Sequence, residues 1–168
     1  MADDWGNQPG GRNDGHKFDF SKITEHIYIG SDLCRGGICL VHAEEFKKLG
    51  VTVEINLSKE DNELPPSNIE GYTWLPVEDG HAPTFMQLQI GTKVIHEAIK
   101  DGRTVYVHCR NGHARSPTLV VAYLIKYGGY TIEKAIEVVK SRREEIHIEE
   151  VQMKSLTDFV ETRKISKS

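Results

Sequence analysis

The segment from residue 104 to residue 125 constrains the fold more than any other part of the chain. Residues 104–107, Thr-Val-Tyr-Val, predict a strand, and residues 119–125 form an apolar run suited to a buried helix. Between them lies the short stretch His-Cys-Arg-Asn-Gly-His-Ala-Arg-Ser. The chain therefore passes from a strand through a tight loop into the amino terminus of a helix, which indicates an α/β fold.

Cys109 and Arg115 stand near the two ends of this loop. The dipole and the free N–H groups of a helix amino terminus favour the thiolate form of a cysteine placed there. The same N–H groups can bind a phosphate dianion, and Gly112 lets the backbone turn them inward. Arg115 lies six positions after the cysteine and can return from the first helical turn to bind two phosphate oxygens. The loop thus predicts a nucleophile beside an anion-binding site.

Strand and helix patterns alternate along the chain before this loop, and the pattern after it is helical. Strands are predicted at residues 24–29, 51–57, 72–77 and 103–108. Helices are predicted at residues 40–49, 84–100, 115–127 and 148–162, with another that begins after an N-cap at Thr131. The helical period places several residues on buried sides: Ile90, Val94, Ile95, Ala98 and Ile99 in one helix, and Ile148, Val151, Leu156, Phe159 and Val160 in the last.

The composition predicts one soluble globular domain. Of the 168 residues, 38% are hydrophobic and 27% are charged, which is ordinary for a domain with a full core. We expect a flexible tail over residues 1–20, which are rich in Gly, Asp and Asn, and a single domain over residues 21–168. No apolar run is long enough for a membrane span, and the net charge of −4 argues against broad nucleic-acid binding. We expect a monomer.

The three cysteines are odd in number and unevenly spaced, which indicates a reducing compartment rather than a disulfide framework. The amino terminus lacks a signal-peptide pattern, so we expect a cytoplasmic protein, with the nucleus also compatible. Cys34 and Cys39 could form a metal site with His108, Cys109 and His113, but the spacing departs from usual ligand patterns, and we expect no metal and no cofactor. A disulfide between either of them and Cys109 under oxidation is the other option.

The string His-Cys-x5-Arg-Ser at residues 108–116 resembles the signature of the cysteine-dependent protein phosphatases, and in detail that of their small dual-specificity branch. Residues 23–31 and 50–57 resemble the first strand of that catalytic domain and its next parallel strand, and residues 75–83 resemble the segment that carries its acid. About residues 21–163 align with such a domain. The resemblance implies an α/β fold in which helices flank a central, mostly parallel sheet of about four to five strands.

The resemblance also implies a role for each residue of the loop. Cys109 would attack phosphorus to form a phosphocysteine, and Arg115 would hold the phosphoryl group, most strongly in the transition state. Ser116 would support Cys109 as the leaving thiolate, or serve only as a helix amino-terminal serine. His108 would be structural, with its ring bonded to the loop backbone. Phosphate or a sulfate-like anion would bind to a loop made of Arg110, Asn111, Gly112, His113, Ala114 and Arg115.

Asp79, 30 residues before Cys109, matches the family's general acid in position and type. It would protonate the leaving oxygen and then take a proton from the attacking water. Because Asp-Gly is itself a turn signal, Asp79 could instead be a turn residue, and the adjacent Glu78 would then be the acid.

The expected substrates are phosphorylated proteins, at phosphotyrosine and at phosphoserine or phosphothreonine. The resemblance implies this breadth, because the chain has no room for the extra loop that deepens the cleft of large tyrosine-specific domains. Arg110 and His113 add positive charge near the pocket, and His113 hints at a strongly anionic substrate unless it is a solvated loop residue. A phosphoinositide or a phosphorylated glucan is therefore the alternative substrate.

Two other interpretations stay open. One is a phosphate-binding interaction module with negligible turnover, although this chain keeps Cys109, Arg115 and Asp79. The other is a rhodanese-like or cell-cycle-phosphatase-like domain, which also places a cysteine in a loop before a helix. The loop string and Asp79 favour the dual-specificity branch over both.

Overall fold

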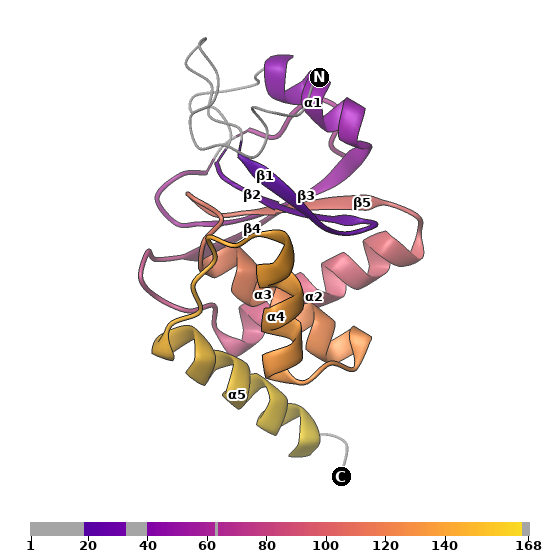
Figure 1. Cartoon of the computed structure of the whole chain (residues 1–168). Helices are drawn as coiled ribbons and strands as arrows, with labels where there is room; N and C mark the ends of the chain where they lie inside the picture. Colours follow the sequence, from indigo (N-terminus) through magenta and orange to yellow (C-terminus); the bar gives the residue numbers. More distant parts are fainter. Residues whose placement is uncertain (1–18, 33–39, 63, 166–168) are drawn as a thin grey trace.

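A computed structural model describes residues 19–32, 40–62 and 64–165, and in these residues helices flank both faces of a five-stranded sheet (Figure 1). The strands are β1 (Phe20–Thr24), β2 (Ile27–Gly30), β3 (Val51–Ser58), β4 (Gly71–Val77) and β5 (Thr104–His108). The helices are α1 (Leu40–Leu49), α2 (Phe85–Lys100), α3 (Arg115–Gly128), α4 (Ile132–Arg142) and α5 (Glu150–Ile165). The strand order is β1-β2-β5-β3-β4, in which only β1 runs antiparallel to its neighbour. The predicted fold class is confirmed.

One predicted strand, residues 24–29, is wrong as a single element. It divides into the end of β1 and most of β2, which form an antiparallel hairpin around a turn at Glu25 and His26. The hydroxyl of Thr24 accepts the N–H of His26 at 3.3 Å, and such a local bond competes with extended backbone. The turn was hidden in the sequence because β-branched residues on both sides of it resemble one continuous run.

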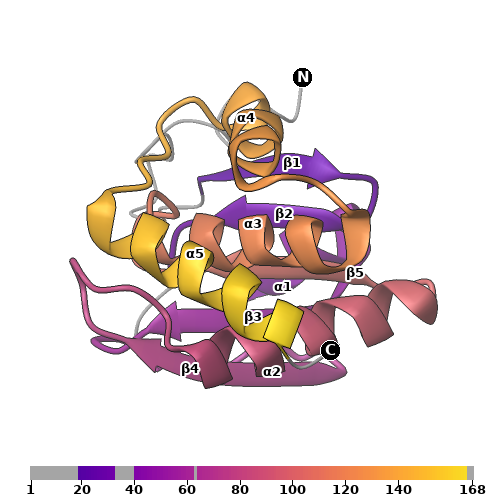
Figure 2. The same cartoon turned by 90° about the horizontal axis from the view of Figure 1, so that it is seen from below.

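The sheet separates two apolar layers of unequal size (Figures 1 and 2). Among the described helices, only α1 covers one face, where Phe46 packs on Tyr106 with ring centroids 4.8 Å apart. The other four helices gather on the opposite face, and α3 lies among them with contacts to α2, α4 and α5. The larger core, between these helices and the sheet, includes residues of β5 on one side and of α3 on the other.

α3 is buried nearly all round, as its apolar sequence predicts. Residues 115–122 are all buried. Gly91 of α2 lies against α3, because a Cβ at that position would lie 2.6 Å from a methyl group of Leu119 and would force that side chain to shift. After α3, Gly129 has a φ of 72°, the left-handed conformation that commonly ends a helix. Core packing therefore fixes α3 and β5, and with them both ends of the loop that the sequence singled out.

Two residues predicted on buried helix sides are wrong. Ile90 is 42% exposed, because Gly91 occupies the position that faces α3. Val151 is 40% exposed, because the neighbouring Gln152, which is 1% exposed, takes the buried position in the first turn of α5. The predicted N-cap at Thr131 is confirmed, since its hydroxyl accepts a backbone N–H in the first turn of α4 at 3.2 Å.

The folded domain reaches back to Asp19, which is buried. Phe20 is the first residue of β1, so two residues of the predicted tail belong to the domain. The rest of that tail lies outside the described residues, and so do Cys34 and Cys39. The metal and disulfide options for these two cysteines therefore stay untested predictions.

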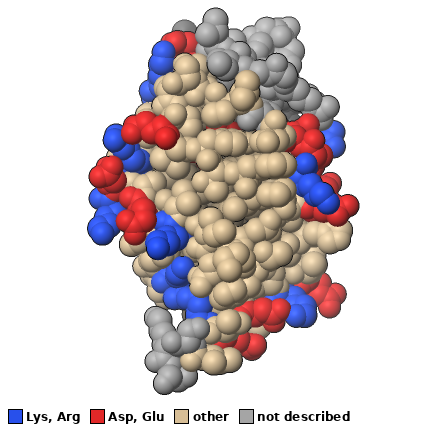
Figure 3. Space-filling view, turned by 180° about the vertical axis from the view of Figure 1, so that it is seen from behind, with Lys and Arg blue, Asp and Glu red and all other residues tan. Residues whose placement is uncertain are grey.

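The side of the molecule that bears β4 and α2 presents a broad uncharged surface with charged residues at its margins (Figure 3). β4 is an edge strand of the described sheet, and its sequence contains no charged residue; nor does that of α2 before Lys93. In the part of the chain that the structure describes, no helix is both long and apolar enough to cross a membrane.

Candidate active site

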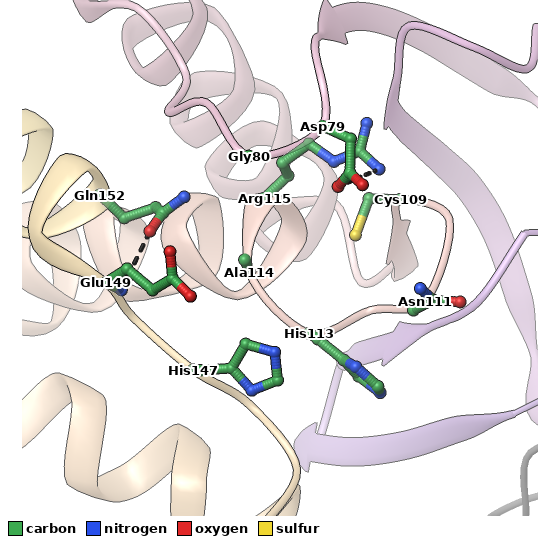
Figure 4. A pocket seen from close by; sticks show the side chains of 10 residues that line it. All are labelled: Asp79, Gly80, Cys109, Asn111, His113, Ala114, Arg115, His147, Glu149 and Gln152. Atoms are coloured by element: carbon green, nitrogen blue, oxygen red, sulfur yellow. Dashed lines mark hydrogen bonds and ion pairs between the residues drawn. The ribbon is translucent and has the colours of Figure 1, made fainter.

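The loop between β5 and α3, residues 109–114, lines a pocket of about 270 Å³ (Figure 4). It follows the carboxyl end of a parallel strand, the edge at which open α/β sheets bind ligands. The lining residues are Asp79, Gly80, Cys109, Asn111, His113, Ala114, Arg115, His147, Glu149 and Gln152. Asp79 and the loop residues are predicted from the sequence, whereas His147, Glu149 and Gln152 are not; these three come from the segment between α4 and α5 and from α5 itself.

Cys109 is buried at the start of the loop, with 2% of the residue exposed. Its sulfur accepts the N–H of Gly112 at 3.3 Å and lies 3.3 Å from the hydroxyl oxygen of Ser116. Burial raises the pKa of the thiol, but hydrogen bonds from Ser116, the charge of Arg115 and the Gly112 N–H together lower it below its ordinary value. The loop therefore supplies a physical cause for the predicted thiolate.

The outer side of the loop is held by Arg143, which follows α4 and which the sequence analysis missed. Its Nε donates to the carbonyl oxygen of Gly112 at 2.9 Å, and Nη2 donates to the carbonyl oxygen of Asn111 at 2.9 Å. Gly112 has a φ of 68°, and a Cβ there would lie 2.6 Å from the carbonyl oxygen of Gly30, so glycine is required. Because these carbonyls point toward Arg143, neighbouring N–H groups are free to face the pocket.

Arg143 also neutralises the acidic groups nearby. Ligand atoms of Asp19, His113 and Glu145 lie within 4.8 Å of one another, an arrangement that could suggest a metal site. Arg143 donates to both carboxylate oxygens of Asp19 at 3.1 and 2.8 Å and lies 3.2 Å from the carboxylate of Glu145. The cation that these carboxylates hold is therefore a guanidinium group of the chain itself.

Arg115 is buried in the first turn of α3, and three acceptors hold its guanidinium group in one orientation. Its Nη1 and Nη2 donate to the two carboxylate oxygens of Glu60 at 2.7 and 2.6 Å. Nη1 also donates to the carbonyl oxygen of Val77 at 2.8 Å, and Nη2 lies 3.2 Å from Oδ1 of Asp79 (Figure 4). A guanidinium group has five N–H donors in one plane, so donors beyond those that face Glu60 and Val77 are left for a phosphate group.

Glu60 is a site residue that the sequence analysis missed. Its hydrogen bonds to Arg115 lower the pKa of the carboxyl group from 4.5 to about 2. In the sequence it belongs to the charged run Lys59-Glu60-Asp61, which is typical of an exposed loop. The available signal was its place just after a predicted strand, because the carboxyl ends of neighbouring parallel strands meet at one edge of the sheet.

Asp79 and Glu78 point in different directions. Asp79 lines the pocket, and its carboxylate points toward Arg115 and Cys109 (Figure 4). The carboxylate of Glu78 is exposed, lies 3.5 Å from Nζ of Lys59 and does not line this pocket. The geometry favours Asp79 over Glu78 as the general acid, and the role itself stays a prediction.

The acid loop, residues 79–83, contains no helix or strand, and side chains of α5 hold it in place. Gln152 is 1% exposed, and its Nε2 donates to the carbonyl oxygen of His81 at 3.1 Å. The hydroxyl of Ser155 donates to the carbonyl oxygen of Pro83 at 2.7 Å. α5 therefore connects the loop that carries the predicted acid to the packed helical layer.

His108, the last residue of β5, is buried between two carboxylates. Its Nε2 lies 2.7 Å from Oε1 of Glu54, with both side chains 0% exposed, and its Nδ1 lies 3.6 Å from Oδ1 of Asp32. Burial lowers the pKa of His108, but Asp32 and Glu54 raise it to about 10, so the ring is a cation at neutral pH. The predicted partner, the loop backbone, is wrong, because β3 places a buried glutamate beside β5.

The two basic residues predicted around the pocket differ in position. Arg110 is exposed and does not line this pocket, whereas His113 lines it together with His147, with their ring centroids 5.4 Å apart. Burial, followed by the charges of Arg143 and His147, lowers the pKa of His113 below its ordinary value. The pocket therefore lacks the predicted charge of Arg110, and the charged form of His113 is disfavoured in it.

A buried cysteine with a lowered pKa, beside a fixed arginine and a loop able to bind an anion, defines the class of cysteine-dependent phosphatases. Comparison with known families agrees with this class. The family described as the dual specificity phosphatase catalytic domain matches residues 36–162, and the chain belongs to this family.

Relatives support the assignment at moderate identity. The chain is 30% identical over 146 residues to the phosphatidylglycerophosphate phosphatase PTPMT2 of Arabidopsis thaliana, which covers 83% of this chain and 62% of that protein. It is 34% identical over 126 residues to dual specificity protein phosphatase 5 of Rattus norvegicus, which covers 73% of this chain and 30% of that protein. The chain thus spans less than two thirds of each of these two relatives. The crystal structure of a mouse putative dual specificity phosphatase superposes on this chain with a TM-score of 0.74 at 22% identity. The superposition covers 88% of this chain and 90% of that one, so the two proteins share the same fold.

Proposed function

We propose that the protein hydrolyses phosphate monoesters through a phosphocysteine intermediate, without a metal ion or cofactor. The observation that carries the proposal is the setting of Cys109, whose sulfur lies 3.3 Å from both the Gly112 nitrogen and the Ser116 hydroxyl. These contacts and Arg115 lower the pKa of the thiol, and the thiolate is the nucleophilic form of cysteine.

In the first step, the Cys109 thiolate attacks phosphorus and the bond to the ester oxygen breaks. Asp79 gives its proton to the departing oxygen, so that the product leaves as an alcohol or phenol. Loop N–H groups and the guanidinium group of Arg115 hold the phosphoryl oxygens while their charge redistributes. Arg115 needs no reorientation for this task, because Glu60 and the Val77 carbonyl already fix its plane.

In the second step, water attacks the phosphocysteine and gives a proton to the Asp79 carboxylate. The sulfur–phosphorus bond breaks, inorganic phosphate is released and the thiolate is restored. The hydroxyl of Ser116, 3.3 Å from the sulfur, can donate a hydrogen bond to the departing thiolate. The enzyme thus returns to its starting protonation state after one turnover.

We propose phosphorylated proteins as the substrates, at phosphotyrosine and at phosphoserine or phosphothreonine, in the cytoplasm or nucleus. Membership of the dual-specificity family supports this breadth, and a thiolate nucleophile needs a reducing compartment. A phosphorylated lipid or glucan is the alternative, and the first of these has support in the name of the Arabidopsis relative.

The test is phosphate release from p-nitrophenyl phosphate in the presence of EDTA, with native protein and Cys109→Ser compared. We expect activity in the native protein and none in the variant, which should still bind orthovanadate or phosphate. Inactivity of native protein whose thiol is reduced and whose fold is intact would overturn the proposal and favour a phosphate-binding interaction module.

A further inference from the structure

The charges around the pocket differ from those expected of a site for a polyanion. Among the described residues that line it, Arg115 is the only one with a permanent positive charge. Its guanidinium group is already paired with Glu60 and lies 3.2 Å from Asp79. The pocket walls also include the carboxylate of Glu149.

Glu149 presents its carboxylate to the pocket from a fixed backbone position. Its N–H donates to Oε1 of the buried Gln152 at 3.0 Å, and its carbonyl oxygen accepts the N–H of Met153 at 2.9 Å, at the start of α5. Figure 4 shows the side chain directed into the pocket, between His147 and Gln152. Within the described part of the chain, no ion pair neutralises this carboxylate.

His113 contributes little positive charge to offset the carboxylate of Glu149. The pKa of His113 is lowered by burial and by the charges of Arg143 and His147. The N–H of His147 donates to the carbonyl oxygen of His113 at 2.8 Å, which keeps both residues at the same wall as Glu149. Loop N–H groups and Arg115 can hold one phosphate group, and a second anion on the substrate would face Glu149.

We propose that Glu149 selects phosphorylated peptides with a basic side chain next to the phosphorylated residue and disfavours substrates with a second phosphate group. This inference rests on the proposed phosphatase function and narrows its substrate class. A nearby lysine or arginine of the substrate pairs with the free carboxylate, whereas a second phosphate is repelled by it. The same charge disfavours a phosphoinositide that carries further phosphates.

The experiment compares three phosphotyrosine peptides that differ only in having Arg, Gln or Glu on both sides of the phosphotyrosine. With native protein, we expect kcat/KM to be about 1.5- to 5-fold higher for the Arg peptide than for the Gln peptide, and lower again for the Glu peptide. Glu149→Gln should bring the three values together, and Glu149→Lys should reverse their order. Because each comparison is a ratio within one protein, differences in the amount of folded protein cancel.

The matched control is Glu150→Gln, since Glu150 is the adjacent exposed carboxylate and does not line the pocket. This variant should keep the native order of the three peptides. The same order in native protein, Glu149→Gln and Glu149→Lys would overturn the inference. So would faster hydrolysis of a soluble phosphatidylinositol bisphosphate than of the Gln peptide. Failure of the phosphatase proposal would look different, because native protein would then release no phosphate from any peptide or from p-nitrophenyl phosphate.

Discussion

Glu60→Gln should loosen the guanidinium group of Arg115 and slow hydrolysis. In the native protein the two carboxylate oxygens of Glu60 accept N–H groups of Arg115 at 2.6 and 2.7 Å. Glutamine keeps one acceptor oxygen and replaces the other with an NH₂ donor, which cannot face a guanidinium N–H. The bidentate pair is reduced to a single hydrogen bond, and Arg115 is then held by that bond, by the carbonyl of Val77 and by its approach to Asp79.

The structure sets the size of the stability effect. The pKa of Glu60 is lowered from 4.5 to about 2, which corresponds to at most ~3.4 kcal/mol at ~1.36 kcal/mol per pKa unit. Solvent reaches 28% of the side chain, and screening reduces the contribution to about 1–2 kcal/mol. A carboxyl group with a depressed pKa stabilises the fold above pH 4.5, and this contribution is lost as the pH falls toward 2. The difference in unfolding free energy between native protein and Glu60→Gln should therefore disappear near pH 2.

The effect on catalysis should be larger than the effect on stability, because a small displacement of the guanidinium group of Arg115 weakens its binding to the phosphoryl oxygens in the transition state and raises the activation free energy. We expect kcat/KM for p-nitrophenyl phosphate to fall about 10- to 100-fold, with weaker inhibition by orthovanadate. Glu70→Gln is the matched control, since Glu70 forms an exposed ion pair with Arg103 at 3.1 Å and does not line the pocket. A kcat/KM for Glu60→Gln within twofold of the native value would refute the orienting role.

Three further predictions concern the acid, the acid loop and the buried histidine. Asp79→Asn should slow turnover of substrates with poor leaving groups by about 10²- to 10⁴-fold and remove the basic limb of the pH–rate profile. Glu78→Gln should do neither. The opposite result would make Glu78 the acid. Gln152→Ala should free the acid loop and lower kcat about tenfold for poor leaving groups while the affinity for orthovanadate is kept, and an equal loss for all leaving groups would contradict this. Glu54→Gln should lower the unfolding free energy by about 1–3 kcal/mol, because it removes the charge-assisted hydrogen bond of 2.7 Å to His108 and leaves Asp32, at 3.6 Å, as the remaining carboxylate. His108 has a pKa of about 10 in the folded protein and 6.5 as its ordinary value, so its contribution to the unfolding free energy is full below pH 6.5 and is lost toward pH 10. Urea unfolding at pH 6 and at pH 9.5 should therefore show a smaller pH dependence of the unfolding free energy in Glu54→Gln than in native protein. An unchanged pH dependence would count against the ion pair.

The part of the site that lies in one stretch of sequence could be predicted. Cys109, Gly112 and Arg115 follow one strand and enter one helix, so their relative positions depend mainly on local backbone geometry. The thiolate, the anion-binding loop and the arginine therefore follow from residue type and spacing. Asp79 was found through its resemblance to a family motif, and no local physical rule places it beside Cys109.

The misses have different physical causes. The hairpin of β1 and β2 was missed because the β-branched residues around its turn resemble one strand. Ile90 was placed inward by the helical period, which does not reveal that the neighbouring Gly91 is the residue that lies against Leu119 of α3. Glu149 and Gln152 could not be assigned because nothing in their own sequence shows that the start of α5 lies against the acid loop.

The fold class and the reacting group follow from sequence alone, because the strand, the loop and the helix that create a thiolate beside an anion site are contiguous. The charges that surround this group depend on the folded arrangement of the chain. Glu54 of β3 contacts His108, Glu60 of the loop after β3 contacts Arg115, and Glu149 lines the pocket from just before α5. Charges interact through space and depend on burial, so their effect on Arg115 and His108 appears only once the order of the strands and the packing of the helices are known.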